Sequence, residues 1–377
     1  MAPARMGSCV FIWPCAFALI GAVGCGGGSS DATGPTPLPT PLETATPMRT
    51  ASPVAAWAAG GSVARSLDGG MTWDVVFEHE GLEATEFADA STGWAVGSSA
   101  SPVVFRSEDG GSTWADQSAD LDSVQLLNEI VVLSDRRALL FGSFNAPGGF
   151  GLGPSLVLGT TNGGATWEAS RVTDGQSNFD FAAMPLQSAC TTDGVLVLAC
   201  GIGSFDVGPS CALSADAGGR WMGLSRGVAA RHAGCTGVAT LWGFTFRTLR
   251  RSRDRGETWA EIDALPAGFQ GRVRSMAFAD ESHGWLVGDE NGRPLILHTS
   301  DGGDSWHRQT LPDDVTGELL DVVFANSEVG LAVGGTNLNS APGPLGFATR
   351  DGGNQWVRAS FPQGLSRLTD AAIAPLP

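Results

Sequence analysis

The amino-acid sequence predicts an all-β protein, a seven-bladed β-propeller of four-stranded antiparallel blades, and three observations lead to this prediction. An eight-residue phrase, Ser/Thr-x-Asp-x-Gly-x-x-Trp, recurs seven times along the 377-residue chain. Successive tryptophans of this phrase lie from 38 residues (Trp221 to Trp259) to 54 residues (Trp167 to Trp221) apart, which is typical of propeller blades. A second phrase precedes the first, as in FADASTGWAVG at 87–97 and FADESHGWLVG at 278–288, and supplies short apolar runs broken by turn residues.

Each residue type in the eight-residue phrase has a mechanical role in a hairpin turn. The Asp carboxylate accepts hydrogen bonds from nearby backbone N–H groups, the Gly takes a positive φ, and the Trp buries a large ring between blades. The phrase is similar to the Asp-box of the bacterial neuraminidase repeat. Because the turns occupy these acids, we expect a structural role for the seven box positions, which are Asp68, Asp109, Asn162, Asp216, Asp254, Asp301 and Asp351.

The second blade illustrates the order of strands that we expect. Strand one is predicted at 83–88, strand two at 94–97, strand three at 103–107 and strand four from Trp114, with the box turn between strands three and four. Residues 56–66 match strands two and three without a strand one, and residues 368–374 match a strand one. We therefore expect the C-terminal strand to pair with the N-terminal blade and close the ring, which leaves no open sheet edge.

The first 53 residues indicate targeting and a tether. Residues 1–24 combine Arg5 with a short apolar stretch, which predicts a secretory signal peptide, and the end of this segment resembles a bacterial lipoprotein cleavage box. We expect lipidation of Cys25, a flexible Gly/Ser/Thr/Pro-rich tether over 25–53, and the propeller over 54–377. The expected location is the cell envelope, through a lipid anchor, with a plain secreted protein as the alternative.

Four cysteines lie within the predicted ring, in a compartment that permits disulfides. They allow three pairings, and we favour Cys200 with Cys211 because these two flank one loop between strands two and three. Neither a Cys-x-x-Cys motif nor a metal-ligand spacing among the five histidines occurs, so we expect no metal. All 22 basic residues are Arg, which excludes a Walker-type phosphate loop with its Lys, and we expect no cofactor.

Composition also excludes several functions. The net charge of −17 argues against nucleic acid as a partner. Sialidases use a Tyr nucleophile, and this chain contains no Tyr. A glycosidase with paired carboxylates across one ring stays open, and Asp89, Asp280 and Asp321 are the acids to inspect. Their recurrence at similar blade positions favours turn and strand-end roles instead.

The two repeated phrases together resemble those of the photosystem II assembly-factor propellers over about residues 55–375. This resemblance implies a seven-bladed, non-catalytic ring that holds membrane-protein intermediates, partly through an Arg-rich surface. We therefore expect a monomeric bacterial scaffold that binds a protein partner or an assembly intermediate. The alternative is a glycan-binding or glycan-cleaving propeller.

Two surfaces are candidates for partner binding. One is an arginine cluster on the third strand and box turn of the fifth blade, for which a solvated edge strand is the structural explanation. The other is the face opposite the box turns, where long loops at 143–155, 201–210 and 335–346 emerge. The candidate residues are Arg247, Arg250, Arg251, Arg253 and Arg255 in the cluster, and Phe144, Phe150 and Phe205 in the loops.

Overall fold

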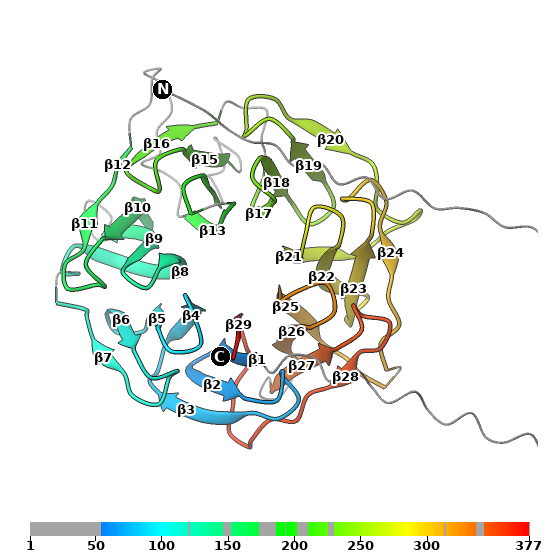
Figure 1. The fold of residues 1–377 in the computed structure, drawn as a ribbon, viewed down its shortest axis with the longest axis horizontal. Helices are drawn as coiled ribbons and strands as arrows, with labels where there is room; N and C mark the ends of the chain where they lie inside the picture. Colours follow the sequence, from blue (N-terminus) through cyan, green and yellow to red (C-terminus); the bar gives the residue numbers. More distant parts are fainter. Residues whose placement is uncertain are drawn as a thin grey trace, which may run out of the picture. The chain divides into compact units, whose positions relative to one another are not determined.

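The structure, a computed structural model, describes residues 54–119, 121–145, 152–172, 186–192, 194–201, 210–224, 230–312, 314–336 and 343–376. They belong to one compact unit, Thr50–Pro377. Its strands form seven sheets, antiparallel except for one short parallel pair, which are arranged as blades around a central channel (Figure 1). Within the described ranges every regular element is a strand. The prediction of an all-β, seven-bladed propeller is confirmed.

In each blade the first strand lines the channel and the fourth lies at the periphery (Figure 1). Blade 1 contains β29 (Asp370–Pro375), β1 (Val54–Ala59), β2 (Ser62–Ser66) and β3 (Asp74–Glu78). Blade 2 contains β4 (Leu82–Phe87), β5 (Gly93–Ser98), β6 (Pro102–Ser107) and β7 (Ala115–Asp116). Blade 3 contains β8 (Val124–Ser134), β9 (Arg137–Asn145), β10 (Leu152–Thr160) and β11 (Glu168–Ala169).

The remaining four blades follow the same order. Blade 4 contains β13 (Leu186–Thr191), β14 (Val197–Gly201), β15 (Ser210–Ser214) and β16 (Arg220–Gly223). Blade 5 contains β17 (His232–Thr236), β18 (Thr240–Phe244), β19 (Leu249–Ser252) and β20 (Ala260–Ile262). Blade 6 contains β21 (Arg272–Phe278), β22 (Gly284–Glu290), β23 (Arg293–Thr299) and β24 (His307–Arg308), and blade 7 contains β25 (Glu318–Phe324), β26 (Gly330–Gly335), β27 (Pro344–Thr349) and β28 (Val357–Arg358).

The two ends of the ring meet in blade 1, as predicted. Strand β29 pairs antiparallel with β1, in a register that runs from Val54 opposite Pro375 to Ala59 opposite Asp370. Just before β29, the Thr369 hydroxyl donates to the carbonyl oxygen of Glu83 in blade 2 at 2.6 Å. The C-terminal strand therefore fills the inner position of the first blade and also contacts its neighbour.

Blade 4 differs from the expected four strands. A two-residue strand, β12 (Arg171–Val172), pairs in parallel with β16 and makes this sheet five-stranded. The sequence did not predict it, because two residues carry no period from which a strand can be recognised.

Apolar side chains from neighbouring blades pack together in the seams of the ring. Trp57 of blade 1 stacks on Phe87 of blade 2, with ring centroids 3.6 Å apart. Its indole N–H donates to the carbonyl oxygen of Gly110 in the next box at 3.0 Å. A Cβ added at Gly111 would lie 3.1 Å from the Trp57 Nε1 atom, and the φ of Gly111 is +85°. The box glycine thus serves both the turn and the close approach of the neighbouring blade.

The box carboxylates accept hydrogen bonds within their own turns. In blade 2, Asp109 accepts hydrogen bonds from the Thr113 N–H at 2.8 Å and the Thr113 hydroxyl at 2.7 Å, and Ser107 donates to it at 2.9 Å. In blade 5, hydrogen bonds from Thr258 and Ser252 lower the pKa of Asp254 to about 2. The corresponding acceptor groups of the other boxes make similar bonds, in Asp68, Asn162, Asp216, Asp301 and Asp351.

Candidate functional site

The central channel is the main candidate for a binding site, because all seven blades contribute to it. A cavity of about 370 Å³ is lined by the first strands β4, β8, β13, β17, β21, β25 and β29. A second cavity of about 210 Å³ lies where these strands begin, and its lining includes Glu83, His232 and Arg274. The start of a first strand lies on the same side of the ring as the loops between strands two and three. This end of the channel therefore opens on the loop face that the sequence analysis favoured for binding.

An aromatic ring between two arginines lies at this end. Phe246, in the loop between β18 and β19, has the Cζ atom of Arg231 5.0 Å from its ring centroid and that of Arg274 5.1 Å away. Glu318 accepts from the Arg274 guanidinium at 2.8 Å and from that of Arg367 at 3.2 Å. We call this group of five residues the channel mouth.

The charges of the channel mouth do not cancel. It contains three arginines and one carboxylate, and Glu318 already binds two of the three. In the described part of the chain Arg231 takes part in no ion pair, and its guanidinium lies against the Phe246 ring. Nearby, burial and the positive charges of Arg274 and Arg231 lower the pKa of His232 to about 4, so this imidazole is neutral at physiological pH. The channel mouth is therefore a small cationic and aromatic surface on an acidic protein.

Deeper in the channel lie four carboxyl groups, which we call the channel carboxylates. They come from four first strands: Glu86 on β4, Glu129 on β8, Asp321 on β25 and Asp370 on β29. Burial raises the pKa of each, to about 8 for Glu86, and the neighbouring carboxylates raise the pKa values of Glu129 and Asp370 further. Three of the four accept backbone hydrogen bonds from a neighbouring blade.

The three acids considered for catalysis separate into two groups. Asp89 accepts from the N–H groups of Ser91 and Thr92 at 2.7 and 2.8 Å, and Asp280 caps its own turn in the same way. These two have the turn roles that their recurrence indicated. Asp321 differs, because it lies within β25 and faces the channel.

The arginine cluster does not form one surface, because β19 runs across the thickness of the ring. Arg247, at the loop end, donates to the Gln270 carbonyl oxygen at 3.2 Å. Arg251 is buried and donates to the Gly302 carbonyl oxygen at 2.9 Å and to Asp304 at 2.6 Å, which ties blade 5 to the box turn of blade 6. The other three also contact neighbouring groups: Arg250 binds Glu261, Arg253 binds Asp304, and Arg255 donates to the Val238 carbonyl oxygen.

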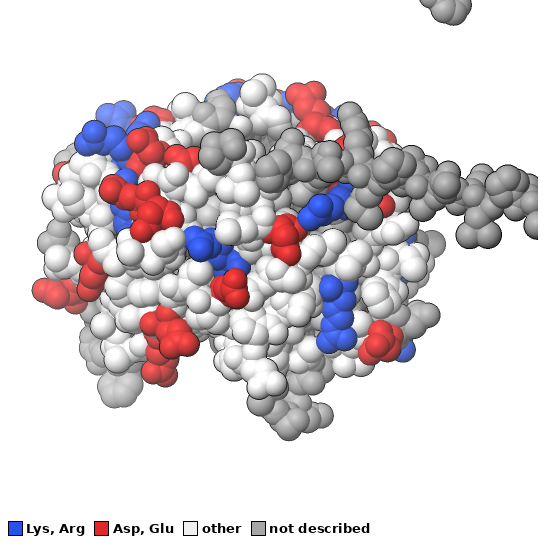
Figure 2. Space-filling view, turned by 60° about the horizontal axis from the view of Figure 1, so that its bottom comes forward, with Lys and Arg blue, Asp and Glu red and all other residues white. Residues whose placement is uncertain are grey.

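The face of the molecule in Figure 2 has the same pattern of paired charges. On the side shown in Figure 2, basic groups of the described residues lie beside acidic groups instead of forming a continuous basic patch. Partner recognition through charge is therefore expected at local positions such as the channel mouth.

The predicted loop phenylalanines give a mixed result. Phe144 lies near the end of β9, is half-buried, and packs against the apolar cluster between blades 2 and 3. Phe150 and Phe205 lie outside the described residues, as do the signal peptide, the tether and Cys25.

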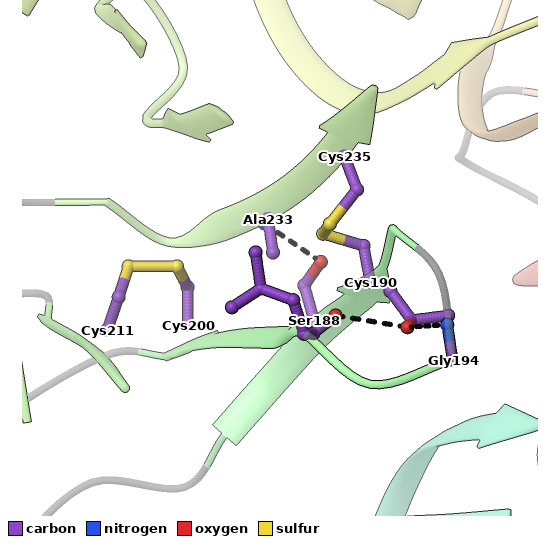
Figure 3. The surroundings of a disulfide bond; sticks show 9 residues. Ser188, Cys190, Gly194, Cys200, Cys211, Ala233 and Cys235 are labelled. Atoms are coloured by element: carbon purple, nitrogen blue, oxygen red, sulfur yellow. Dashed lines mark hydrogen bonds between the residues drawn. A yellow bond between two sulfur atoms is a disulfide. The ribbon is translucent and has the colours of Figure 1, made fainter. Parts of the chain in front are cut away.

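Two disulfides lie in blades 4 and 5 (Figure 3). Cys200 and Cys211, the pair that the sequence favoured, join the neighbouring strands β14 and β15. Cys190 on β13 is bonded to Cys235 on β17, which joins the inner strands of the two blades. Beside this bond the Ser188 hydroxyl oxygen accepts the Ala233 N–H at 3.1 Å (Figure 3).

Among the described residues, no group of three or more His, Cys, Asp or Glu side chains could hold a metal ion. The same ranges contain no helix that is long and apolar enough to cross a membrane.

Sequence reasoning missed the channel mouth and three of the four channel carboxylates. Arg231, Phe246 and Arg274 follow no repeat: the first two belong to blade 5, where they lie 15 residues apart, and Arg274 belongs to blade 6. Glu86 and Asp370 lie in predicted first strands, so an acid in a strand that faces the ring axis was the available signal.

The repeats of this chain are similar in sequence to those of a known protein family. Residues 253–367 match the family described as "Photosynthesis system II assembly factor YCF48". A stretch of 102 residues is 33% identical to the photosystem II assembly lipoprotein Ycf48 of Synechococcus sp. (strain CC9902), over 26% of this chain and 26% of that protein. The chain thus matches about a quarter of the length of this curated relative.

Two solved structures share the fold. "YCF48 bound to D1 peptide" is similar with a TM-score of 0.55 and 18% identity, over 76% of this chain and 89% of that one. YCF48 from Cyanidioschyzon merolae is similar with a TM-score of 0.53 and 23% identity, over 73% of this chain and 87% of that one. Together with the sequence matches, these findings confirm the predicted resemblance to the photosystem II assembly factor-like propellers.

Proposed function

We propose that this chain, a photosystem II assembly factor-like propeller, is a non-catalytic scaffold that binds a segment of a protein partner across the channel mouth. The relatives that it resembles are named assembly factors, and one of them is solved with a bound peptide. The observation that carries the proposal is the Phe246 ring between Arg231 and Arg274, on the face where the loops between strands two and three emerge.

The chemistry of the channel mouth selects the kind of partner. The planar guanidinium of Arg231 has donors left for a carboxylate, and the Phe246 ring offers an apolar surface beside it. Rigid first strands hold Arg274 in place, while a loop carries Phe246, an arrangement common in binding sites. A peptide with an acidic side chain next to an apolar one fits this surface best.

The proposal includes a lipid anchor on Cys25, which would keep the ring at a membrane surface of a bacterial envelope. The names of the cyanobacterial relatives, which describe lipoproteins, support it. Growth with labelled palmitate should label the wild-type protein and leave a Cys25→Ser variant unlabelled. A wild-type protein without label would favour the plain secreted form.

Binding is tested with the tagged, full-length protein, purified from native membranes after mild crosslinking and analysed by mass spectrometry. We expect one protein partner in stoichiometric amount. The double variant Arg231→Gln/Phe246→Ala should lose it, whereas Arg253→Gln, an exposed arginine at the box end of β19, should retain it. Equal recovery with both variants would contradict the channel mouth as the site. If no protein is recovered, a glycan array and a glycosidase screen test the alternative function.

A further inference from the structure

The inner edge of each first strand presents backbone N–H groups to the channel with no further strand to accept them. Three channel carboxylates accept such groups from the next blade. Asp370 accepts the Thr85 N–H at 2.7 Å, across the seam from blade 1 to blade 2. Asp321 accepts the Ala371 N–H at 3.0 Å, across the seam from blade 7 to blade 1. The closing strand β29 is therefore held on both sides by carboxyl groups.

The third such bond extends the series by one blade. Glu86 accepts the Val132 N–H at 2.5 Å, across the seam from blade 2 to blade 3. Within the described residues Glu129 makes no such cross-blade bond, and it accepts the N–H of Ile130 in its own strand at 3.1 Å. It contributes an ionisable group to the channel rather than a bond across a seam.

Protons must be present for these groups to lie together. Asp321 accepts the N–H of Ala371, the residue that follows Asp370, and the carboxyl groups of Asp321 and Asp370 line the same cavity. Asp321 also accepts from the Ser275 hydroxyl at 2.6 Å. Four adjacent charges of one sign in a buried channel would repel strongly, so the neutral forms are favoured there.

No cation on the packed elements balances these groups. Strands β1 and β26, which contact β29, carry no titratable side chain. At the channel mouth, Arg274 and Arg367 bind Glu318. The other charged or titratable groups on the strands around β29 are acids: Glu83 and Glu86 on β4, Glu129 on β8, and Glu318 and Asp321 on β25.

We propose that closure of the ring is linked to protons, and that ionisation of the channel carboxylates at alkaline pH releases β29 from blades 2 and 7. The repulsion acts first on Asp370, because it faces Asp321, Glu86 and Glu129 from β29, the strand that pairs the C-terminal end of the ring with its N-terminal end. Opening at this strand would separate the seams on either side of blade 1 and leave the other blades paired.

The direction of the pH dependence follows from proton linkage. A carboxyl group with a raised pKa binds its proton more tightly in the folded protein, so its contribution is complete below the unfolded value and is lost as the pH rises. For Glu86 the ordinary value is 4.5 and the folded pKa is about 8. That single group should raise the unfolding equilibrium constant on the order of a thousandfold between pH 4.5 and pH 8.

Hydrogen exchange, read by mass spectrometry on the full-length protein from pH 6 to pH 9, tests the proposal. Protection of the peptide that contains β29 is compared at each pH with that of a peptide from β22, which corrects for the intrinsic pH dependence of exchange. We expect the ratio to fall at least tenfold toward pH 9 in the wild type. In Asp370→Asn it should stay constant, because the Asn side chain does not ionise and is not repelled by Asp321, Glu86 and Glu129.

Two further variants keep the test decisive. Asp74→Asn removes an exposed acid from the outer strand of the same blade and should behave as the wild type. If Asp370→Asn does not fold, Glu129→Gln removes a channel charge and no cross-blade bond, and should shift the loss of β29 protection to higher pH. A constant ratio in the wild type, or an unshifted loss in Glu129→Gln, would overturn the proposal.

Discussion

Reduction of the two disulfides should destabilise the ring by unequal amounts, because a disulfide acts mainly on the unfolded chain. Cys190 and Cys235 lie 45 residues apart, and Cys200 and Cys211 lie 11 residues apart. The loop-entropy relation then gives about 4 kcal/mol for the first bond and about 3 kcal/mol for the second. The native contacts favour the same order, since β14 and β15 are already paired without their disulfide.

The assay measures each disulfide alone. In a background with Cys9, Cys15 and Cys25 replaced by Ser, the variant Cys200→Ala/Cys211→Ala retains only the long-range bond. The variant Cys190→Ala/Cys235→Ala retains only the short-range bond. The free energy of unfolding in urea, measured with and without a reductant, isolates the bond that remains, because the oxidised and reduced forms have the same side chains.

We expect the drop on reduction to be about 1 kcal/mol larger for the variant that retains Cys190 and Cys235. Equal drops, or a larger drop for the pair Cys200 and Cys211, would refute the reasoning from loop length. Native strain or residual structure in the unfolded chain would then decide the effect.

Three further changes have defined outcomes. Ala217 occupies a box position with a φ of +59°, where most boxes have Gly, so its backbone is strained. The substitution Ala217→Gly should therefore raise the free energy of unfolding in urea by about 1 kcal/mol, and a decrease would contradict strain at this position. Arg251→Gln should lower the free energy of unfolding by about 2 kcal/mol in the same assay, because the buried Arg251 guanidinium joins two blades. Arg253→Gln should lower it by less than about 0.5 kcal/mol, because the Arg253 side chain is 60% exposed. Deletion of 370–377 removes β29 and should lower the melting temperature by circular dichroism sharply; an unchanged melt would contradict closure through this strand.

The architecture was predictable because its signals repeat. Each box places a short-range set of hydrogen bonds within eight residues, as Asp109 illustrates, so the phrase alone indicates the turn. The strand boundaries differ by one or two residues, as in β4 (Leu82–Phe87) against the predicted 83–88. Closure was predictable as well, because 368–374 supplies the strand that the first blade lacks.

The arginine cluster shows the limit of reading residues that are close in sequence as one surface. Strand β19 is extended, so Arg247 and Arg255 lie toward opposite faces of the ring, and Arg251 between them is buried against the next blade. These arginines are close in sequence, but they do not lie together on one surface, because an extended strand separates them in space.

Local sequence determined the turns and the number of blades, because each turn depends on residues within one repeat. It also determined the closing strand, because the first repeat lacks a strand that the C-terminal residues supply. Tertiary structure alone decided which side chains meet at the ring axis. Phe246 meets Arg274 from the next blade, and Asp370 and Asp321 line the same cavity on either side of the closing seam. Such groups come from different blades, and only the curvature of the ring, set by packing between blades, brings them together.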